Sequence, residues 1–230
     1  MDRKIIFSII AVTLAALVLA IVLPGGRSIE QNPRLPWIIT LDESGFTTVF
    51  GVTIGKSTLD QVRRNFQEQG VTNLFVSPDR KLAVETYFQS LYLNGIKADV
   101  VVTLDLQQSQ LSAFYNRGLR ISQLESGAKK VKLAEQDLES LAQGIVGHIT
   151  YIPSADLEED LILSRFGEPT RRIAEPSGIV HWLYRQKGMD IAVNPQGKEV
   201  FQYISLSRFD ELIAPLLGRE SSVYRPRRGE

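Results

Sequence analysis

The sequence contains no cysteine, and this absence excludes a whole group of chemistries. Disulfides, thiolate nucleophiles, zinc–thiolate sites and iron–sulfur clusters all need that residue, as does lipid attachment through an N-terminal cysteine. The folded part of the chain must therefore be stabilised by burial of apolar side chains. Hydrophobic residues make up 43% of the 230 residues, which is enough for a sizeable core.

Net charge is also absent. The 26 Lys and Arg residues are matched by 26 Asp and Glu residues, so the formal charge is zero. A chain without excess positive charge has no general attraction for phosphate backbones. We therefore expect no nucleic-acid partner.

Histidine is scarce, and no pattern typical of catalysis or metal binding is present. His148 and His181 each lie in a predicted strand without a carboxylate at helical ligand spacing, so we interpret both as hydrogen-bonded structural residues. The carboxylates of residues 156–160 fall at a predicted helix start, where the helix dipole favours them. No serine has the G-x-S-x-G pattern of a nucleophile elbow. The sequence predicts no enzyme activity, no metal and no cofactor.

Residues 51–57, GVTIGKS, resemble a phosphate-binding P-loop. Their glycines are one residue too close for backbone amides to surround a phosphate. In the later segment 100–105, apolar and polar positions alternate. This pattern is typical of an antiparallel strand and not of the buried parallel strand found in P-loop folds. We predict a turn followed by a helix, and no bound nucleotide.

One long apolar segment is present, at residues 5–23. A helix of this length spans about 28 Å, close to the hydrocarbon thickness of a bilayer. Arg3 and Lys4 precede it, which favours a cytoplasmic N-terminus. We predict a single-pass anchor in the inner (cytoplasmic) membrane, bound to the lipid bilayer, with the C-terminal domain on the periplasmic or extracytoplasmic side. A cleaved signal peptide is the alternative.

The rest of the chain predicts an α+β fold of two helix-and-antiparallel-meander modules. We expect a linker at 24–36, a first module at 37–118, a connecting helix and strand at 119–150, a second module at 151–217 and a flexible basic tail at 218–230. Asn94-Gly95 predicts a hairpin between strands 85–93 and 96–106. Further expected elements are helices from Ser57 to about Gly70, at 134–145, 156–166 and 207–212, and strands at 111–115, 148–152, 171–175, 179–185, 189–194 and 198–205.

Two short motifs stand out: Gly55-Lys56-Ser57 with Val62 and Phe66, and residues 165–170 (RFGEPT) with Trp182-Leu183-Tyr184. Both resemble motifs of the BamE-like (SmpA/OmlA) family. The resemblance implies a helix followed by a short meander in each module. Two modules in tandem would be similar in architecture to beta-lactamase-inhibitor proteins. The lipid-bearing cysteine of outer-membrane family members has no counterpart here.

The predicted strand 179–185 is apolar on both faces. Its own helix would cover one face, and the other would be covered either by the first module or by a partner protein. The candidate interaction surface comprises His181, Trp182, Leu183 and the tail residues Arg225, Arg227 and Arg228. The sequence thus predicts a membrane-anchored cell-envelope protein that acts by protein–protein interaction with an unidentified envelope protein. The alternatives are a small-ligand binder or enzyme with a site between the modules, and a purely structural tethered domain.

Overall fold

The computed structural model describes residues 34–223, with side chains up to residue 217. The predicted anchor at 5–23, most of the linker and the tail residues Arg225, Arg227 and Arg228 lie outside this range. Within it, no helix combines the length and apolar character needed to cross a membrane. Residues from Arg34 onward form one compact unit by their internal contacts.

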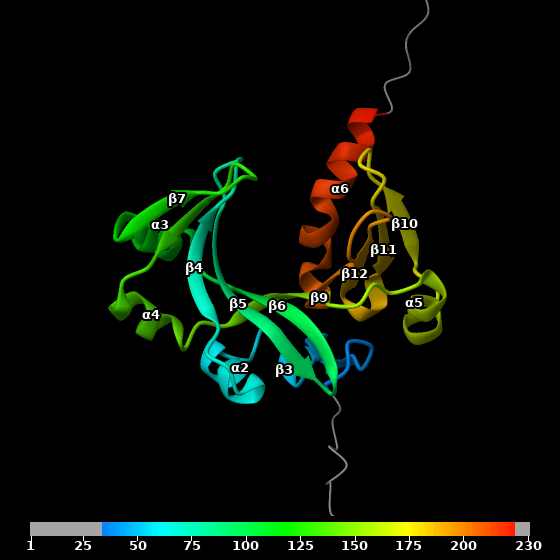
Figure 1. The fold of residues 1–230 in the computed structure, drawn as a ribbon, viewed down its shortest axis with the longest axis horizontal. Coiled ribbons are helices and arrows are strands. Elements are labelled where there is room, and N and C mark those ends of the chain that lie inside the picture. Colours follow the sequence, from blue (N-terminus) through cyan, green and yellow to red (C-terminus); the bar gives the residue numbers. More distant parts are fainter. Residues whose placement is uncertain (1–33, 224–230) are drawn as a thin grey trace, which may run out of the picture. The chain divides into compact units, whose positions relative to one another are not determined.

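The predicted α+β class is confirmed by a large antiparallel sheet combined with helices (Figure 1). The described helices are α2 (Leu59–Phe66), α3 (Gln108–Asn116), α4 (Glu135–Leu141), α5 (Glu159–Phe166) and α6 (Phe209–Val223). The ten-stranded sheet contains β4 (Val71–Val76), β5 (Leu82–Leu93), β6 (Ile96–Leu104), β7 (Arg120–Gln123), β8 (Lys129–Lys132), β9 (Val146–Pro153), β10 (Arg171–Ala174), β11 (Val180–Tyr184), β12 (Met189–Val193) and β13 (Val200–Ile204). A small second sheet contains β1 (Thr40–Leu41), β2 (Thr47–Val49) and β3 (Val52–Thr53).

A helix followed by antiparallel strands occurs twice along the described chain. Helix α2 precedes β4, β5 and β6, and α5 precedes β10 to β13. The strand order is β10-β11-β12-β13-β9-β6-β5-β4-β8-β7, so the two sets are neighbours in one continuous sheet, joined through β9. Helices α3 and α4 and the β7–β8 hairpin are inserted between β6 and β9, and β8 pairs with the outer side of β4.

The two repeated helices bury equivalent side chains, as their spacing predicts. Val62 and Phe66 of α2 and Ile162 and Phe166 of α5 are all buried in the main core. Helix α2 begins at Leu59, two residues after the predicted start at Ser57, because the capping side chain is Thr58, which accepts a hydrogen bond from the backbone of Gln61.

Two expectations about secondary structure are wrong. Residues 111–115 belong to helix α3 and not to a strand, because a short apolar run does not distinguish the two states and Gln110 hydrogen-bonds the backbone of Gln107 at the helix start. The last helix is much longer than 207–212: a 3₁₀ turn at Leu206–Arg208 leads into α6.

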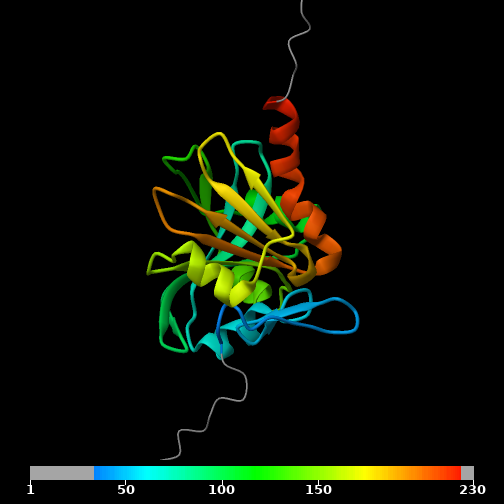
Figure 2. The same ribbon diagram turned by 90° about the vertical axis from the view of Figure 1, so that its right-hand side faces the viewer.

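Helix α6 decides what covers the second face of strand β11. Leu183 packs in a separate apolar cluster with Ile173 of β10, Ile204 of β13 and the α6 residues Phe209, Ile213 and Leu216. The sequence left the first module and a partner protein as alternatives for this face, and the structure covers it with α6 instead. Figure 2 shows α6 (red) running beside the strands of this end of the sheet.

Candidate functional site

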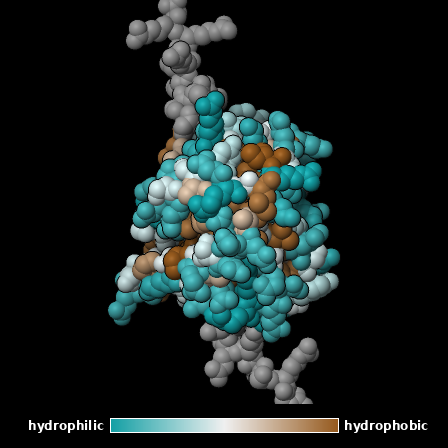
Figure 3. All heavy atoms as spheres, turned by 90° about the vertical axis from the view of Figure 1, so that its left-hand side faces the viewer, coloured by the Kyte–Doolittle hydropathy of each residue, from teal (hydrophilic) through white to brown (hydrophobic). Residues whose placement is uncertain are grey.

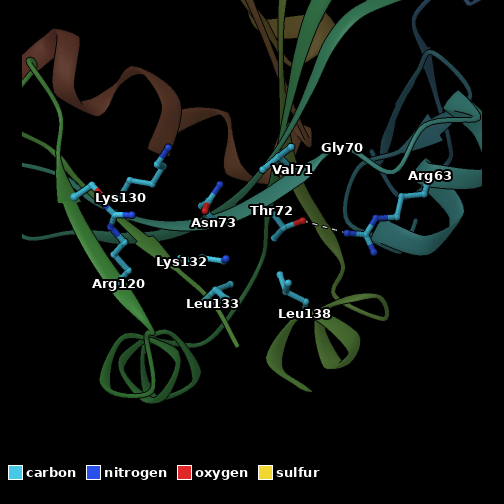
Figure 4. A pocket seen from close by; sticks show the side chains of 11 residues that line it. Arg63, Gly70, Val71, Thr72, Asn73, Arg120, Lys130, Lys132, Leu133 and Leu138 are labelled. Atoms are coloured by element: carbon cyan, nitrogen blue, oxygen red, sulfur yellow. Dashed lines mark hydrogen bonds between the residues drawn. The ribbon is translucent and has the colours of Figure 1, made fainter. Parts of the chain in front are cut away.

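A basic cleft of about 470 Å³ lies where the start of β4 and the end of β8 meet helices α2 and α4. Its lining is drawn in Figure 4 and consists of Arg63, Gly70, Val71, Thr72, Asn73, Arg120, Ser122, Lys130, Lys132, Leu133 and Leu138. These lining residues include four cationic side chains and no carboxylate. We call this feature the basic cleft.

The β7–β8 hairpin contributes most of the charge. Arg120 is the direct cross-strand neighbour of Lys132, and Ser122 is the neighbour of Lys130. Because side chains alternate along a strand, these four lie on one face, whereas Val131 is fully buried on the other. Like charges placed directly opposite each other are destabilising. Repulsion between Arg120 and Lys132 therefore lowers the stability of the hairpin, and a bound anion would relieve this repulsion.

Arg63 reaches the cleft from α2, on the side opposite the hairpin (Figure 4). Its Nε donates to the carbonyl oxygen of Gln69 at 2.9 Å and its Nη2 donates to Thr72 Oγ1 at 3.1 Å. Burial lowers the pKa of this guanidinium, while the nearby charge of Asp60 acts in the opposite direction. The contacts fix the position of Arg63 through neutral oxygens and leave its charge uncompensated within the cleft.

The other cations of the cleft lie on the β7–β8 hairpin. Among the described residues, Arg120, Lys130 and Lys132 form no salt bridge. The lining contains no carboxylate and no imidazole, so it offers no general base of the usual kinds. What this arrangement does chemically is attract and hold anionic groups.

A second cavity, of about 400 Å³, lies between α6 and the sheet, and we call it the α6 pocket. It is lined by Thr103, Leu104, Gly147, His148, His181, Asp190, Gln202, Ile204, Arg208, Glu211, Leu212, Pro215 and Leu216. Both histidines of the chain line it. Two buried side-chain oxygens in its lining, Thr103 Oγ1 and Asp190 Oδ1, have no hydrogen-bond partner.

His181 and Asp190 form a close pair in this pocket. His181 Nδ1 lies 2.7 Å from Asp190 Oδ2, and its Nε2 lies 3.7 Å from Glu175 Oε1. Burial alone would lower the pKa of His181, but the hydrogen bond and charges of these carboxylates raise it. Burial raises the pKa of Asp190 despite its bond to His181. Both ring nitrogens of His181 thus face carboxylates.

His148 lies in a different environment. Burial, with a smaller contribution from the charge of Arg208, lowers its pKa to about 4. Its Nε2 lies 3.2 Å from Thr150 Oγ1. The imidazole is therefore neutral at pH 7. Among the described residues, no three His, Asp or Glu side chains are grouped so that they could hold a metal ion.

The structure does not bring the residues selected from sequence onto one exposed surface. Trp182 and Leu183 are each only 2% exposed and point to opposite faces of β11: Trp182 joins the main core, and Leu183 packs under α6. His181 is held by Asp190. Arg225, Arg227 and Arg228 lie outside the described residues.

The residues of the basic cleft are not among those that the sequence patterns single out. The available clue was the pattern R-x-S and K-x-K at 120–122 and 130–132, on the two sides of a turn that contains Gly127. In a hairpin this pattern puts four polar side chains on one face. Arg63 has no such clue, because its position depends on how α2 packs.

Comparison of the chain with known families, with curated proteins and with solved structures finds no match. The resemblance to BamE-like modules therefore stays a prediction.

Proposed function

We propose that this chain is a membrane-anchored cell-envelope protein that binds an acidic segment of a partner protein in the basic cleft. The observation that carries the proposal is the set of four cations in the cleft lining, without a carboxylate among them. Two of these cations, Arg120 and Lys132, oppose each other directly across the hairpin. An arrangement that costs stability and offers no catalytic base is best explained by recognition of an anion.

The cleft suits a protein segment better than a free nucleotide or a nucleic acid. Leu138 lines it beside the cations, and Val71 at its rim is 62% exposed. Apolar contacts of this kind favour a ligand that carries apolar as well as acidic groups. The zero net charge of the chain gives no general attraction for nucleic acid.

The anchor and the envelope location form part of the same proposal. They rest on the apolar run at 5–23 with Arg3 and Lys4 before it. The domain would consist of two helix-and-meander modules in tandem, similar to BamE-like modules. The repeated order of a helix and antiparallel strands supports this interpretation.

A single-cysteine variant tests both the contact and its location, because the natural chain has no cysteine. Ser122→Cys places one thiol in the lining of the cleft. In intact spheroplasts we expect a membrane-impermeant maleimide to label it, and a maleimide photo-crosslinker to join it to a partner protein. Adding Lys130→Glu and Lys132→Glu should lower the crosslinked yield by about tenfold.

Lys129→Glu is the matched control, because Lys129 lies on the same strand but does not line the cleft. It should leave the crosslinked yield unchanged. Labelling that occurs only after lysis would reverse the proposed topology. An equal loss of crosslinking in the control and in the cleft variant would show that the cleft does not select the partner.

A second candidate function is the binding of a small ligand in the α6 pocket. It is favoured by Asp190 Oδ1 and Thr103 Oγ1, since native proteins rarely leave buried oxygens without a hydrogen bond. A ligand with a donor group, such as a small primary amine, would satisfy Asp190. If this candidate is correct, ethanolamine or a similar amine raises the melting temperature of the full-length chain, and Asp190→Asn removes that rise. No shift with small amines would reject it.

A further inference from the structure

Strand β7 is an open edge of the ten-stranded sheet. It is the last strand in the sheet order and pairs only with β8. An edge strand presents a row of backbone N–H and C=O groups to which another extended chain can be added. Two cations of the cleft, Arg120 and Lys130, lie on the β7–β8 hairpin. The open edge and the basic cleft are therefore adjacent.

The pairing register shows which backbone groups point outward. Leu124 N donates to Ala128 O at 2.8 Å, so Leu124 faces β8. In an antiparallel ladder every second residue faces its partner strand, and therefore Ser122, the neighbour of Lys130, faces β8 as well. The N–H and C=O groups of Ile121 and Gln123 then point away from the sheet. Among the described residues, no hydrogen bond to these outward groups is found.

Apolar side chains accompany this edge. Leu119 is 64% exposed and Ile121 is 51% exposed, and Ile121 projects to the face of β7 opposite to Arg120. Figure 3 views the molecule from the side that carries β7, where brown apolar patches interrupt a mostly hydrophilic surface. The opposite edge of the sheet differs, because β10 begins with two arginines and its Ile173 is buried.

We propose that β7 receives an extended segment of the partner protein as an additional strand of the sheet. The segment would alternate acidic and apolar residues. Its acidic side chains would lie on the face of Arg120 and Lys132, and its apolar side chains would lie beside Ile121. This inference rests on the proposed function and specifies the partner segment by its conformation and its pattern.

Charge complementarity excludes the other obvious occupants. A second copy of this chain would bring another β7, which has no acidic residue and carries Arg120, against the same cations. The C-terminal segment of the chain contains Arg225, Arg227 and Arg228 and would be repelled in the same way. An acidic strand removes the repulsion between Arg120 and Lys132 and satisfies the outward backbone groups at the same time.

The test uses the full-length chain in neutral detergent and a short blocked peptide of alternating glutamate and valine. We expect the peptide to bind and to slow hydrogen exchange at the amides of Ile121 and Gln123. A peptide of the same composition with its glutamates grouped should bind about tenfold more weakly, as should the alternating peptide with N-methylated backbone amides.

A protein variant supplies the matching evidence. Gln123→Pro removes one outward N–H without touching the bonds to β8, whereas Gln123→Ala removes the side chain alone. Only the proline variant should weaken binding, again by about tenfold. One outcome would reject strand addition alone: N-methylation and Gln123→Pro have no effect on binding, but the double variant Lys130→Glu with Lys132→Glu abolishes it. The proposed function would then stand. If the charge variant also binds normally, both are wrong.

Discussion

Leu183→Asp is expected to lower the free energy of unfolding by about 4 kcal/mol, because it places a carboxylate in a closed apolar cluster. Leu183 is 2% exposed and packs against Phe209 and Ile213 of α6. Its direct cross-strand neighbour is Asp190, which is itself 1% exposed. The new carboxylate would therefore be both desolvated and next to a like charge. Thermal melting of the full-length chain in neutral detergent measures the loss.

Leu161→Asp is the control for this prediction. The substitution is chemically the same, but Leu161 lies on helix α5 and is 43% exposed. A substitution at such a position should change stability by no more than about 0.5 kcal/mol. A normal melt of Leu183→Asp would mean that α6 does not cover β11 in solution. The face of Leu183 would then be available to a partner.

Gly188→Ala should cost about 3 kcal/mol, because the added methyl group has no room. A Cβ at this position would lie 2.2 Å from the carbonyl oxygen of Ile204. That oxygen cannot move easily, since it accepts a hydrogen bond from Thr47 Oγ1, while Ile204 N donates to the carbonyl of Gly188 itself. Gly188 also has a φ of +60°, which an alanine adopts only with strain.

Gly95→Ala separates the steric collision from the strain of a positive φ. Gly95 has a φ of +83°, but no heavy atom lies within 4 Å of the place its Cβ would occupy. It should therefore show only the conformational cost, about 1 kcal/mol. Chemical denaturation of both variants gives the comparison. Equal losses in the two variants would contradict the predicted collision with the backbone at Ile204.

Features that depend on neighbours in the chain could be predicted from the sequence. Asn94-Gly95 forms the hairpin between β5 and β6 with both residues at positive φ, because few residue pairs adopt that turn as easily. The chain of strands β10 to β13 follows from the turn residues between alternating apolar segments. Gly167 ends α5 with a φ of +78°, where a helix stop was expected.

The candidate site could not be predicted in the same way. The basic cleft joins Arg63 of α2 to the β7–β8 hairpin, two segments brought together because β8 pairs with the outer side of β4. Nothing in either segment indicates this pairing, since an antiparallel strand can add to any free edge of suitable length. The charges of Arg120 and Lys132 are evident in the sequence, whereas the absence of a carboxylate from the cleft lining is a property of the fold.

The sequence by itself determined the α+β class, most of the local elements and the apolar character of both faces of β11, because these depend on the period of side chains and on turn residues. Only the tertiary structure decided that α6 covers the face of Leu183, that the two sets of strands meet in one sheet through β9, and that four cations share a cleft. The physical reason is that an apolar stripe or an open strand edge specifies that it must be covered, but not by which distant segment. That choice is made by the packing of the whole chain.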